Sequence, residues 1–183
     1  MHTSATIITK EGVFNKDNLL QLVHKYKDTG HWLYETASFI EQWTNNSNNI
    51  LIKTSGTTGP AKDVCLSKES IRQSAMLTIQ YFNLHEGDTA LLSLPVSYIA
   101  GKMMIVRSLV AGLTLYLLEP TSNPMLKLDR AAQIKFAPFV PFQLETMLNN
   151  ETTAKRLGHI STIITGGASM NGANKNADRS LAS

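Results

Sequence analysis

The chain has 183 residues, of which 43% are hydrophobic and 17% charged, so it is long enough for a buried core and too apolar for wholesale disorder. Its formal net charge of +3 comes from 17 basic and 14 acidic residues scattered along the chain, which does not favour a nucleic-acid-binding surface. Residues Met1–Lys10 lack an apolar stretch of signal-peptide length, and the longest apolar region, Met103–Leu118, is interrupted by Arg107 and Gly112. We therefore expect a cytoplasmic protein without membrane insertion.

Two helices are predicted at the start of the chain, because apolar residues gather on one side of each segment. The first covers Asn18–Lys27 and the second covers His31–Trp43. A polar, asparagine-rich turn at Thr44–Asn49 then separates the second helix from a run of apolar residues. The pattern predicts two consecutive helices that pack on a core before the first buried strand.

A hairpin is predicted next, from the apolar run Ile50–Ile52 and a returning strand at Val64–Leu66. Cys65 is the only cysteine, which excludes an internal disulfide. We expect it to be a small buried strand residue rather than a nucleophile. Ser67 suits the N-cap of a further helix that reaches about Phe82.

The middle of the chain alternates strands and helices. Ala90–Leu94 and Leu113–Leu118 read as strands, with a helix at Lys102–Ala111 between them and a left-handed cap at Gly112. A strand–helix–strand unit implies parallel strand pairing. The fold class is therefore α/β, with a mixed or parallel sheet and flanking helices. The alternation continues with a helix at Met125–Gln133, a strand at Ile134–Ala137, a helix at Phe142–Leu148 and a strand at Thr162–Ile164.

The last thirteen residues differ in composition from the rest of the chain. From Asn171 to Ser183 the only large apolar residue is Leu181. The stretch is either a disordered terminus or the product of a truncation or frame change, and we favour the second because the chain stops soon after a strand followed by Gly166 and Gly167. We expect residues 1–170 to form part of a domain and residues 171–183 to be a disordered or non-native tail.

The loop that joins the two hairpin strands has the composition of a phosphate-binding site. Glycines let backbone amides approach an anion closely, hydroxyl groups add donors without bulk, and one lysine supplies positive charge. The alternative is a polar hairpin loop that happens to be rich in threonine and glycine. The common nucleoside-triphosphatase loop is excluded, since Pro60 and Ala61 separate the last glycine from the lysine. The candidate phosphate-binding residues are Thr54, Ser55, Gly56, Thr57, Thr58, Gly59 and Lys62.

This loop resembles the phosphate-binding signature of the adenylate-forming superfamily, which includes acyl-CoA synthetases, nonribosomal adenylation domains and luciferases. Ala61 stands where proline is usual, and Asp63 replaces a frequent glycine. Three further segments resemble the family in the same order, and together the resemblance covers roughly residues 50–169. These segments are Leu94–Gly101, Val140–Leu144 and Ile163–Ala168.

The resemblance implies site residues beyond the loop. Gly166, Gly167 and Ala168 would border the nucleotide. Tyr98, Lys102 and Ser169 would lie on the acyl-substrate side. Tyr98 occupies a position where the family often has histidine, so a role that depends on imidazole is not carried over. Lys102 could pair with a dicarboxylate substrate or could equally be a solvated lysine at a helix start. No catalytic residue and no metal ligand is assigned.

The short region ahead of the loop is similar to that of the o-succinylbenzoate–CoA ligases of menaquinone synthesis. The resemblance implies part of the large N-terminal domain of such an enzyme, with a small carboxylate, ATP, Mg²⁺ and coenzyme A as reaction partners. The family's later motifs are not found in Asn171–Ser183. We therefore expect negligible ligase activity from this chain alone, with a non-catalytic nucleotide- or partner-binding fragment as the alternative. Such a fragment would be marginally stable or associate with itself.

Overall fold

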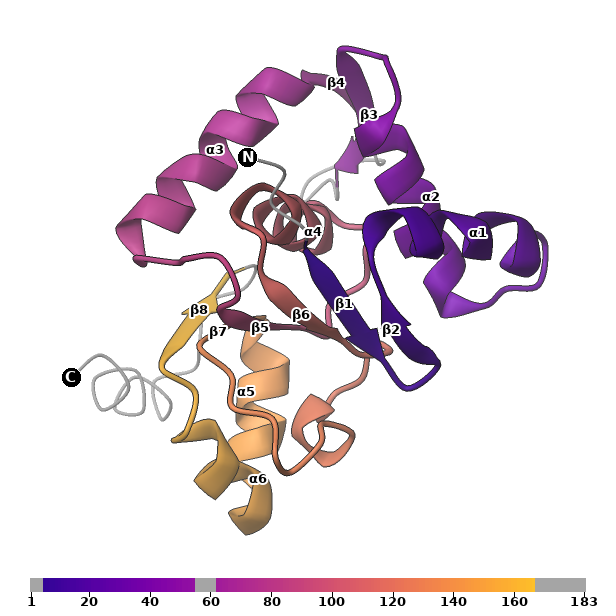
Figure 1. Cartoon of the computed structure of the whole chain (residues 1–183). Coiled ribbons are helices and arrows are strands. Elements are labelled where there is room, and N and C mark those ends of the chain that lie inside the picture. The colour runs from indigo at the N-terminus through magenta and orange to yellow at the C-terminus, as the bar shows by residue number, and fades with distance from the viewer. Residues whose placement is uncertain (1–4, 55–61, 167–183) are drawn as a thin grey trace.

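A six-stranded sheet forms the centre of the computed structural model, which describes residues 5–54 and 62–166 (Figure 1). The strand order is β2-β1-β6-β5-β7-β8, and every pairing is parallel except that of β1 with β2. The predicted α/β class with a mostly parallel sheet and flanking helices is confirmed. The strands are β1 Thr6–Thr9, β2 Gly12–Phe14, β5 Thr89–Leu92, β6 Thr114–Leu117, β7 Phe136–Phe139 and β8 Thr162–Thr165.

Helices cover both faces of this sheet, because its central strands are apolar on both sides. Ala90 and Leu92 of β5 belong to one core cluster and Leu91 belongs to the other. The first cluster takes in α1 Lys16–Tyr26, α2 Trp32–Thr44, α3 Lys68–Tyr81 and α4 Ile99–Ala111. The second takes in a 3₁₀ turn, η1 Pro124–Leu126, with α5 Pro141–Leu148 and α6 Glu151–Leu157. Figure 1 shows α4 and α5 on opposite sides of the strands.

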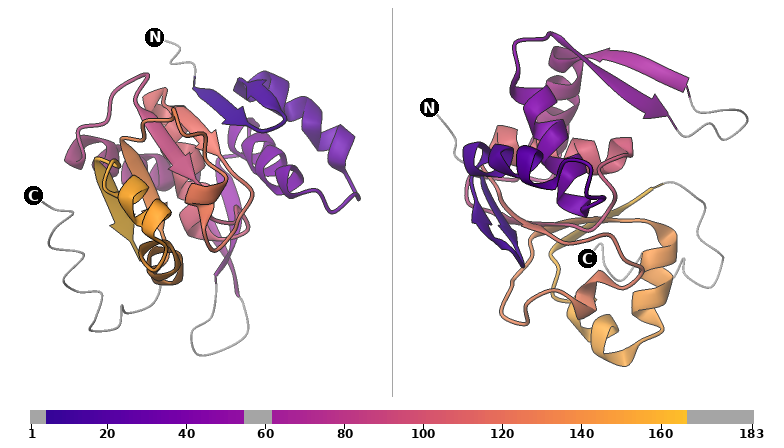
Figure 2. Two further views of the ribbon diagram at one scale, coloured as in Figure 1. Left: turned by 90° about the horizontal axis from the view of Figure 1, so that it is seen from below. Right: turned by 90° about the vertical axis from the view of Figure 1, so that its right-hand side faces the viewer.

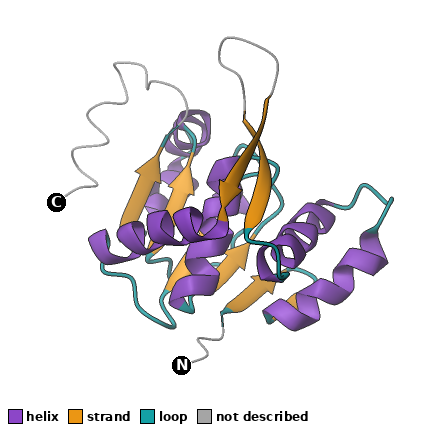
Figure 3. Cartoon of the chain, turned by 90° about the horizontal axis from the view of Figure 1, so that it is seen from above, coloured by secondary structure: helices purple, strands orange, loops and turns teal. Residues whose placement is uncertain are grey.

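A separate two-stranded hairpin, β3 Asn49–Thr54 and β4 Lys62–Ser67, extends away from the main sheet (Figures 2 and 3). Its strands are antiparallel, as predicted, and Thr54 pairs with Lys62 next to the connecting loop. Ile50 and Ile52 are buried, whereas Leu51 is 59% exposed because alternate side chains of a strand face opposite sides. Cys65 is also exposed, since it pairs with Leu51 and shares its outward face. The expectation of a buried Cys65 was wrong.

Several local predictions are confirmed. The Ser67 side chain accepts a hydrogen bond from the Ser70 amide and caps α3. Gly112 adopts φ 69° at the end of α4, in the left-handed region. Strands β5 and β6 pair in parallel, with Leu91 opposite Tyr116.

The predicted helix at Met125–Gln133 is wrong, because only the short 3₁₀ turn η1 forms there. The Arg156 side chain, from α6, donates hydrogen bonds to the backbone carbonyl groups of Met125, Leu128 and Asp129. These carbonyl groups are therefore satisfied by a distant side chain rather than by helical amides. Strands β1 and β2 and helix α6 were not predicted.

Across residues 5–54 and 62–166, no helix combines the length and the apolar character that crossing a bilayer requires.

Candidate functional site

Three of the segments singled out from the sequence follow neighbouring parallel strands at the same edge of the sheet. Ser93–Tyr98 follows β5, Val140 follows β7 and Gly166 follows β8. Strands β5, β7 and β8 are adjacent and parallel, so their carboxyl ends lie along one edge. Ligands of open α/β sheets bind outside this carboxyl edge. The topology therefore brings these segments together.

Gln143, at the start of α5, ties the ends of the strands to one another. It is only 4% exposed, and its Nε2 donates to the carbonyl oxygens of Thr121 at 2.8 Å and Ser93 at 3.3 Å. Its Oε1 accepts the backbone amide of Val140 at 3.2 Å. One buried amide thus joins the segments that follow β5, β6 and β7. The sequence analysis missed this role, although a polar residue at a core position of an amphipathic helix could have indicated it.

Tyr98 lies at the N-cap position of α4 and is 54% exposed. Its side chain makes no capping hydrogen bond to the helix. The preceding segment is held against α4 at Gly101, where an added β-carbon would come within 3.0 Å of the backbone of Pro95 and Val96. Tyr98 is therefore an exposed aromatic group on a firmly held loop.

Lys102 is engaged by the fold and is not a freely solvated lysine. Its Nζ donates to the carbonyl oxygens of Val96 at 2.7 Å and Ser97 at 3.1 Å, and it lies 5.5 Å from the centre of the Phe39 ring. Burial lowers the pKa of the Lys102 ammonium below its ordinary value, and the negative charge of Glu35 partly offsets this. Lys102 therefore holds the loop that leads into α4.

A cavity of about 330 Å³ adjoins Lys102, between α2, β3 and the segment after β5. Glu35, Gln42 and Leu51 line it together with Lys102. The cavity carries one charge of each sign, so it favours neither anions nor cations by its lining alone.

The phosphate-loop residues fall mostly outside the described part of the chain. Thr54 and Lys62 are the last and first residues of the paired hairpin strands, so the two ends of the loop are held side by side. Ser55, Gly56, Thr57, Thr58 and Gly59 lie outside the described residues, as do Gly167, Ala168 and Ser169. Gly166 is exposed directly after β8.

Metal ligands were not predicted from the sequence. Within the two described ranges, no group of three or more His, Cys, Asp or Glu side chains is arranged to hold a metal ion. The described residues therefore offer no protein cage for Mg²⁺, an ion that proteins usually bind through few carboxylates and substrate phosphates.

Comparison with protein families decides the relationship. The model of the family "AMP-binding enzyme" matches residues 2–177. The chain belongs to this family. The predicted membership of the adenylate-forming superfamily is confirmed.

Similar curated proteins of the family are 2-succinylbenzoate–CoA ligases. That of Listeria monocytogenes serotype 4b is 27% identical over 135 residues, covering 73% of this chain and 29% of the relative. That of Listeria innocua serovar 6a is 26% identical over 147 residues, covering 80% of this chain and 31% of the relative. The chain therefore spans less than a third of the length of these relatives.

Solved structures of the family share the fold. An acyl-CoA synthetase (AMP-forming)/AMP-acid ligase II-like protein from Dyadobacter fermentans superposes with a TM-score of 0.72 at 33% identity, covering 79% of this chain and 41% of that protein. The o-succinylbenzoate CoA synthetase of Bacillus subtilis superposes with a TM-score of 0.60 at 23% identity, covering 72% and 27%. These matches agree with a sheet taken from the N-terminal domain of the family.

Proposed function

We propose that this chain supplies part of the ATP- and acyl-binding surface of an acid–CoA ligase that acts on o-succinylbenzoate. The observation that carries the proposal is the convergence of the segments after β5, β7 and β8 at one sheet edge, in a chain of the AMP-binding family. The names of the Listeria relatives support the choice of substrate. Because the chain spans less than a third of those relatives, the complete reaction belongs to a longer protein.

In the proposed reaction a substrate carboxylate attacks the α-phosphorus of ATP and pyrophosphate leaves. The thiol of coenzyme A then attacks the acyl carbonyl carbon of the acyl-adenylate, and AMP leaves as the thioester forms. The residues from Thr54 to Lys62 would hold the β- and γ-phosphates through backbone amides, hydroxyl groups and the lysine charge. Mg²⁺ would neutralise phosphate charge when bound. Gly166, Gly167 and Ala168 would border the nucleotide, since a backbone without bulky side chains lets a planar ring lie close.

The acyl side of the proposed site has Tyr98 and Lys102, with Ser169 beyond the described residues. Tyr98 would contact the acyl group through its exposed ring. The ammonium of Lys102 has three N–H donors, and the carbonyl groups of Val96 and Ser97 accept two of them. The third donor could pair with a second carboxylate of the substrate.

The phosphate-binding part of this proposal is tested by titrating the 183-residue chain with ATP in a calorimeter. Replacing Gly56, Gly59 and Lys62 together by alanine should weaken ATP binding at least about tenfold, because close amide approach and a cation are both lost. Lys127→Ala, which removes one exposed lysine that pairs with Glu119, is the matched control and should leave the affinity unchanged. Unaltered ATP affinity in the triple variant would refute the phosphate-loop assignment.

The ligase part is tested by pyrophosphate exchange that depends on o-succinylbenzoate. The sequence predicts negligible exchange by this chain alone, because the later motifs of the family were not found in it. Exchange at an ordinary enzyme rate would contradict that expectation. ATP binding without acid-dependent exchange would fit a nucleotide-binding fragment.

A further inference from the structure

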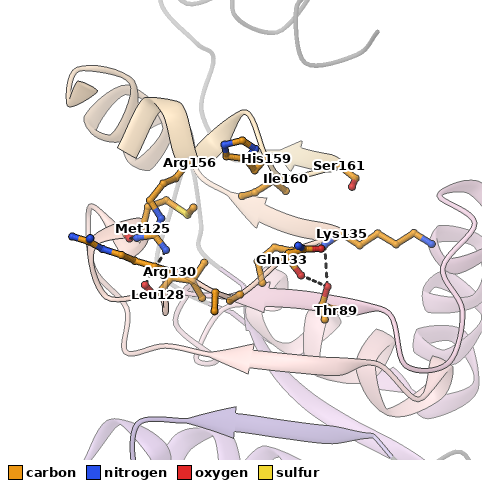
Figure 4. Close-up of a pocket in the computed structure, with 13 residues that line it drawn as sticks. Thr89, Met125, Leu128, Arg130, Gln133, Lys135, Arg156, His159, Ile160 and Ser161 are labelled. Carbon is orange, nitrogen blue, oxygen red and sulfur yellow. Dashed lines mark hydrogen bonds between the residues drawn. The ribbon is translucent and has the colours of Figure 1, made fainter. Parts of the chain in front are cut away.

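A cavity of about 650 Å³ lies at the amino ends of β5, β7 and β8, the edge opposite the candidate site (Figure 4). Thr89 begins β5, Lys135 precedes β7 and Ser161 precedes β8, and all three line the cavity. The four residues of β5 separate the two edges by roughly 13 Å at about 3.3 Å per residue. The cavity is therefore distinct from the proposed ligase site.

The base of this cavity is apolar. Met125, Leu128, Ile134 and Ile160 line it, and each is buried in the core cluster beneath α5 and α6. The volume lies within the range of small-molecule sites, which combine an apolar lining with a few polar groups. An apolar body of several carbon atoms would be in contact with these four side chains.

The charged groups that line the cavity are all basic. They are Arg130, Lys135 and Arg156; the imidazole of His159 also lines the cavity, and no aspartate or glutamate does. The ammonium of Lys135 points away from the other three and pairs with Asp88 at 2.6 Å (Figure 4). Arg130 and Arg156 lie toward one end, and His159 is on the wall formed by α6 and the turn before β8.

Arg156 brings a positive charge that no carboxylate balances among the described residues. Its guanidinium donates to the carbonyl groups of Met125, Leu128 and Asp129, which are neutral. A guanidinium carries five N–H donors, so two remain without an acceptor in the described parts of the chain. Arg130 and His159 are exposed, and their side chains likewise have no hydrogen-bond or ion-pair partner among the described residues. The cavity thus joins an apolar base to unbalanced positive charge.

We propose that this cavity binds a small organic anion, a carboxylate or phosphate ester whose apolar body lies on Met125, Leu128, Ile134 and Ile160. Its charged group lies among Arg130, Arg156 and His159. Arg130 and His159 are the groups to change in a test, because both are exposed at the rim. Arg156 is not a suitable target, since its hydrogen bonds hold the η1 segment in place.

The test is calorimetric titration of the 183-residue chain with phenyl phosphate, benzoate and inorganic phosphate. We expect saturable one-to-one binding of phenyl phosphate or benzoate, and the stronger of the two identifies the head group. The double variant R130Q/H159Q should weaken that binding at least about tenfold, because the charge-assisted contact of Arg130 and the imidazole contact of His159 are both lost. Its urea midpoint should match that of the unchanged chain, since both side chains are exposed.

K155Q is the matched control. Lys155 precedes Arg156 on α6 and carries the same charge, but it pairs with Glu151 and does not line the cavity. The affinity of K155Q for the organic anion should differ from that of the unchanged chain by less than about twofold. Three outcomes would each overturn the proposal. The first is an equal loss of affinity in K155Q and R130Q/H159Q, and the second is inorganic phosphate that binds as tightly as both organic anions. The third is no saturable binding of either organic anion. The affinity of R130Q/H159Q for ATP should equal that of the unchanged chain. Failure of the cavity proposal would therefore leave the ligase proposal untouched.

Discussion

The close contact between α4 and the segment after β5 makes Gly101→Ala the most informative single change. A β-carbon at this position would lie 2.9 Å from the carbonyl carbon of Pro95 and 3.0 Å from the Cα of Val96, and nearer still to the Pro95 oxygen. All three are backbone atoms, so no side-chain rotation can relieve the clash. Ordinary contact begins at 3.4 Å, and α4 must therefore move away from this segment by more than half an ångström.

The expected cost follows from two opposing effects. Overpacking of this kind destabilises by about 1–3 kcal/mol. Alanine regains up to about 1 kcal/mol of helix propensity over glycine, but a clash with rigid backbone lies at the costly end of the overpacking range. We expect a net loss near 2 kcal/mol, or about 30-fold in the ratio of folded to unfolded chain.

Urea unfolding of the 183-residue chain measures this loss. With a slope of roughly 2 kcal/mol per molar, the midpoint of Gly101→Ala should fall by about 1 M. Gly158→Ala is the matched control, because Gly158 ends α6 at φ −62° and its added β-carbon meets the nearest atom, the Lys155 oxygen, at 3.4 Å. The control midpoint should be unchanged or higher. A Gly101→Ala midpoint equal to or above that of the unchanged chain would refute the close approach.

Three further outcomes are expected. Gln143→Leu should cost about 2–3 kcal/mol in urea unfolding, because it leaves buried groups such as the Ser93 carbonyl without a donor, and an unchanged midpoint would contradict the bracing role. Ser67→Ala should cost about 1 kcal/mol by removing the cap of α3, and Ser67→Asp should retain most of the stability. Burial raises the pKa of Asp88. Hydrogen bonds from Lys135 and a backbone amide lower it, as does the Lys135 charge, and the net result is a pKa below the ordinary value. Its stabilisation is present above the unfolded pKa and lost as pH falls through the folded one, so the urea midpoints of Asp88→Asn and the unchanged chain should converge on acidification. A gap that stays constant with pH would exclude this linkage.

Local sequence patterns account for the elements that depend on neighbouring residues. The hairpin strands, the cap at Ser67 and the left-handed Gly112 each rest on residue types that favour one backbone conformation. Strand β1 was missed although β8 has the same sequence, Thr-Ile-Ile-Thr, and was predicted, so strand length does not explain the difference.

The sequence by itself determined the α/β class, the hairpin with its candidate phosphate loop, and the family. Only the tertiary structure decided that Cys65 faces outward, that Lys102 is bound to the carbonyl groups of its own loop, and that the segment after Met125 is not a helix. The tertiary structure also decided that Gln143 joins three strand ends. The physical reason is the range of the interactions: caps and turns act over a few residues, whereas these outcomes depend on groups that only folding brings together.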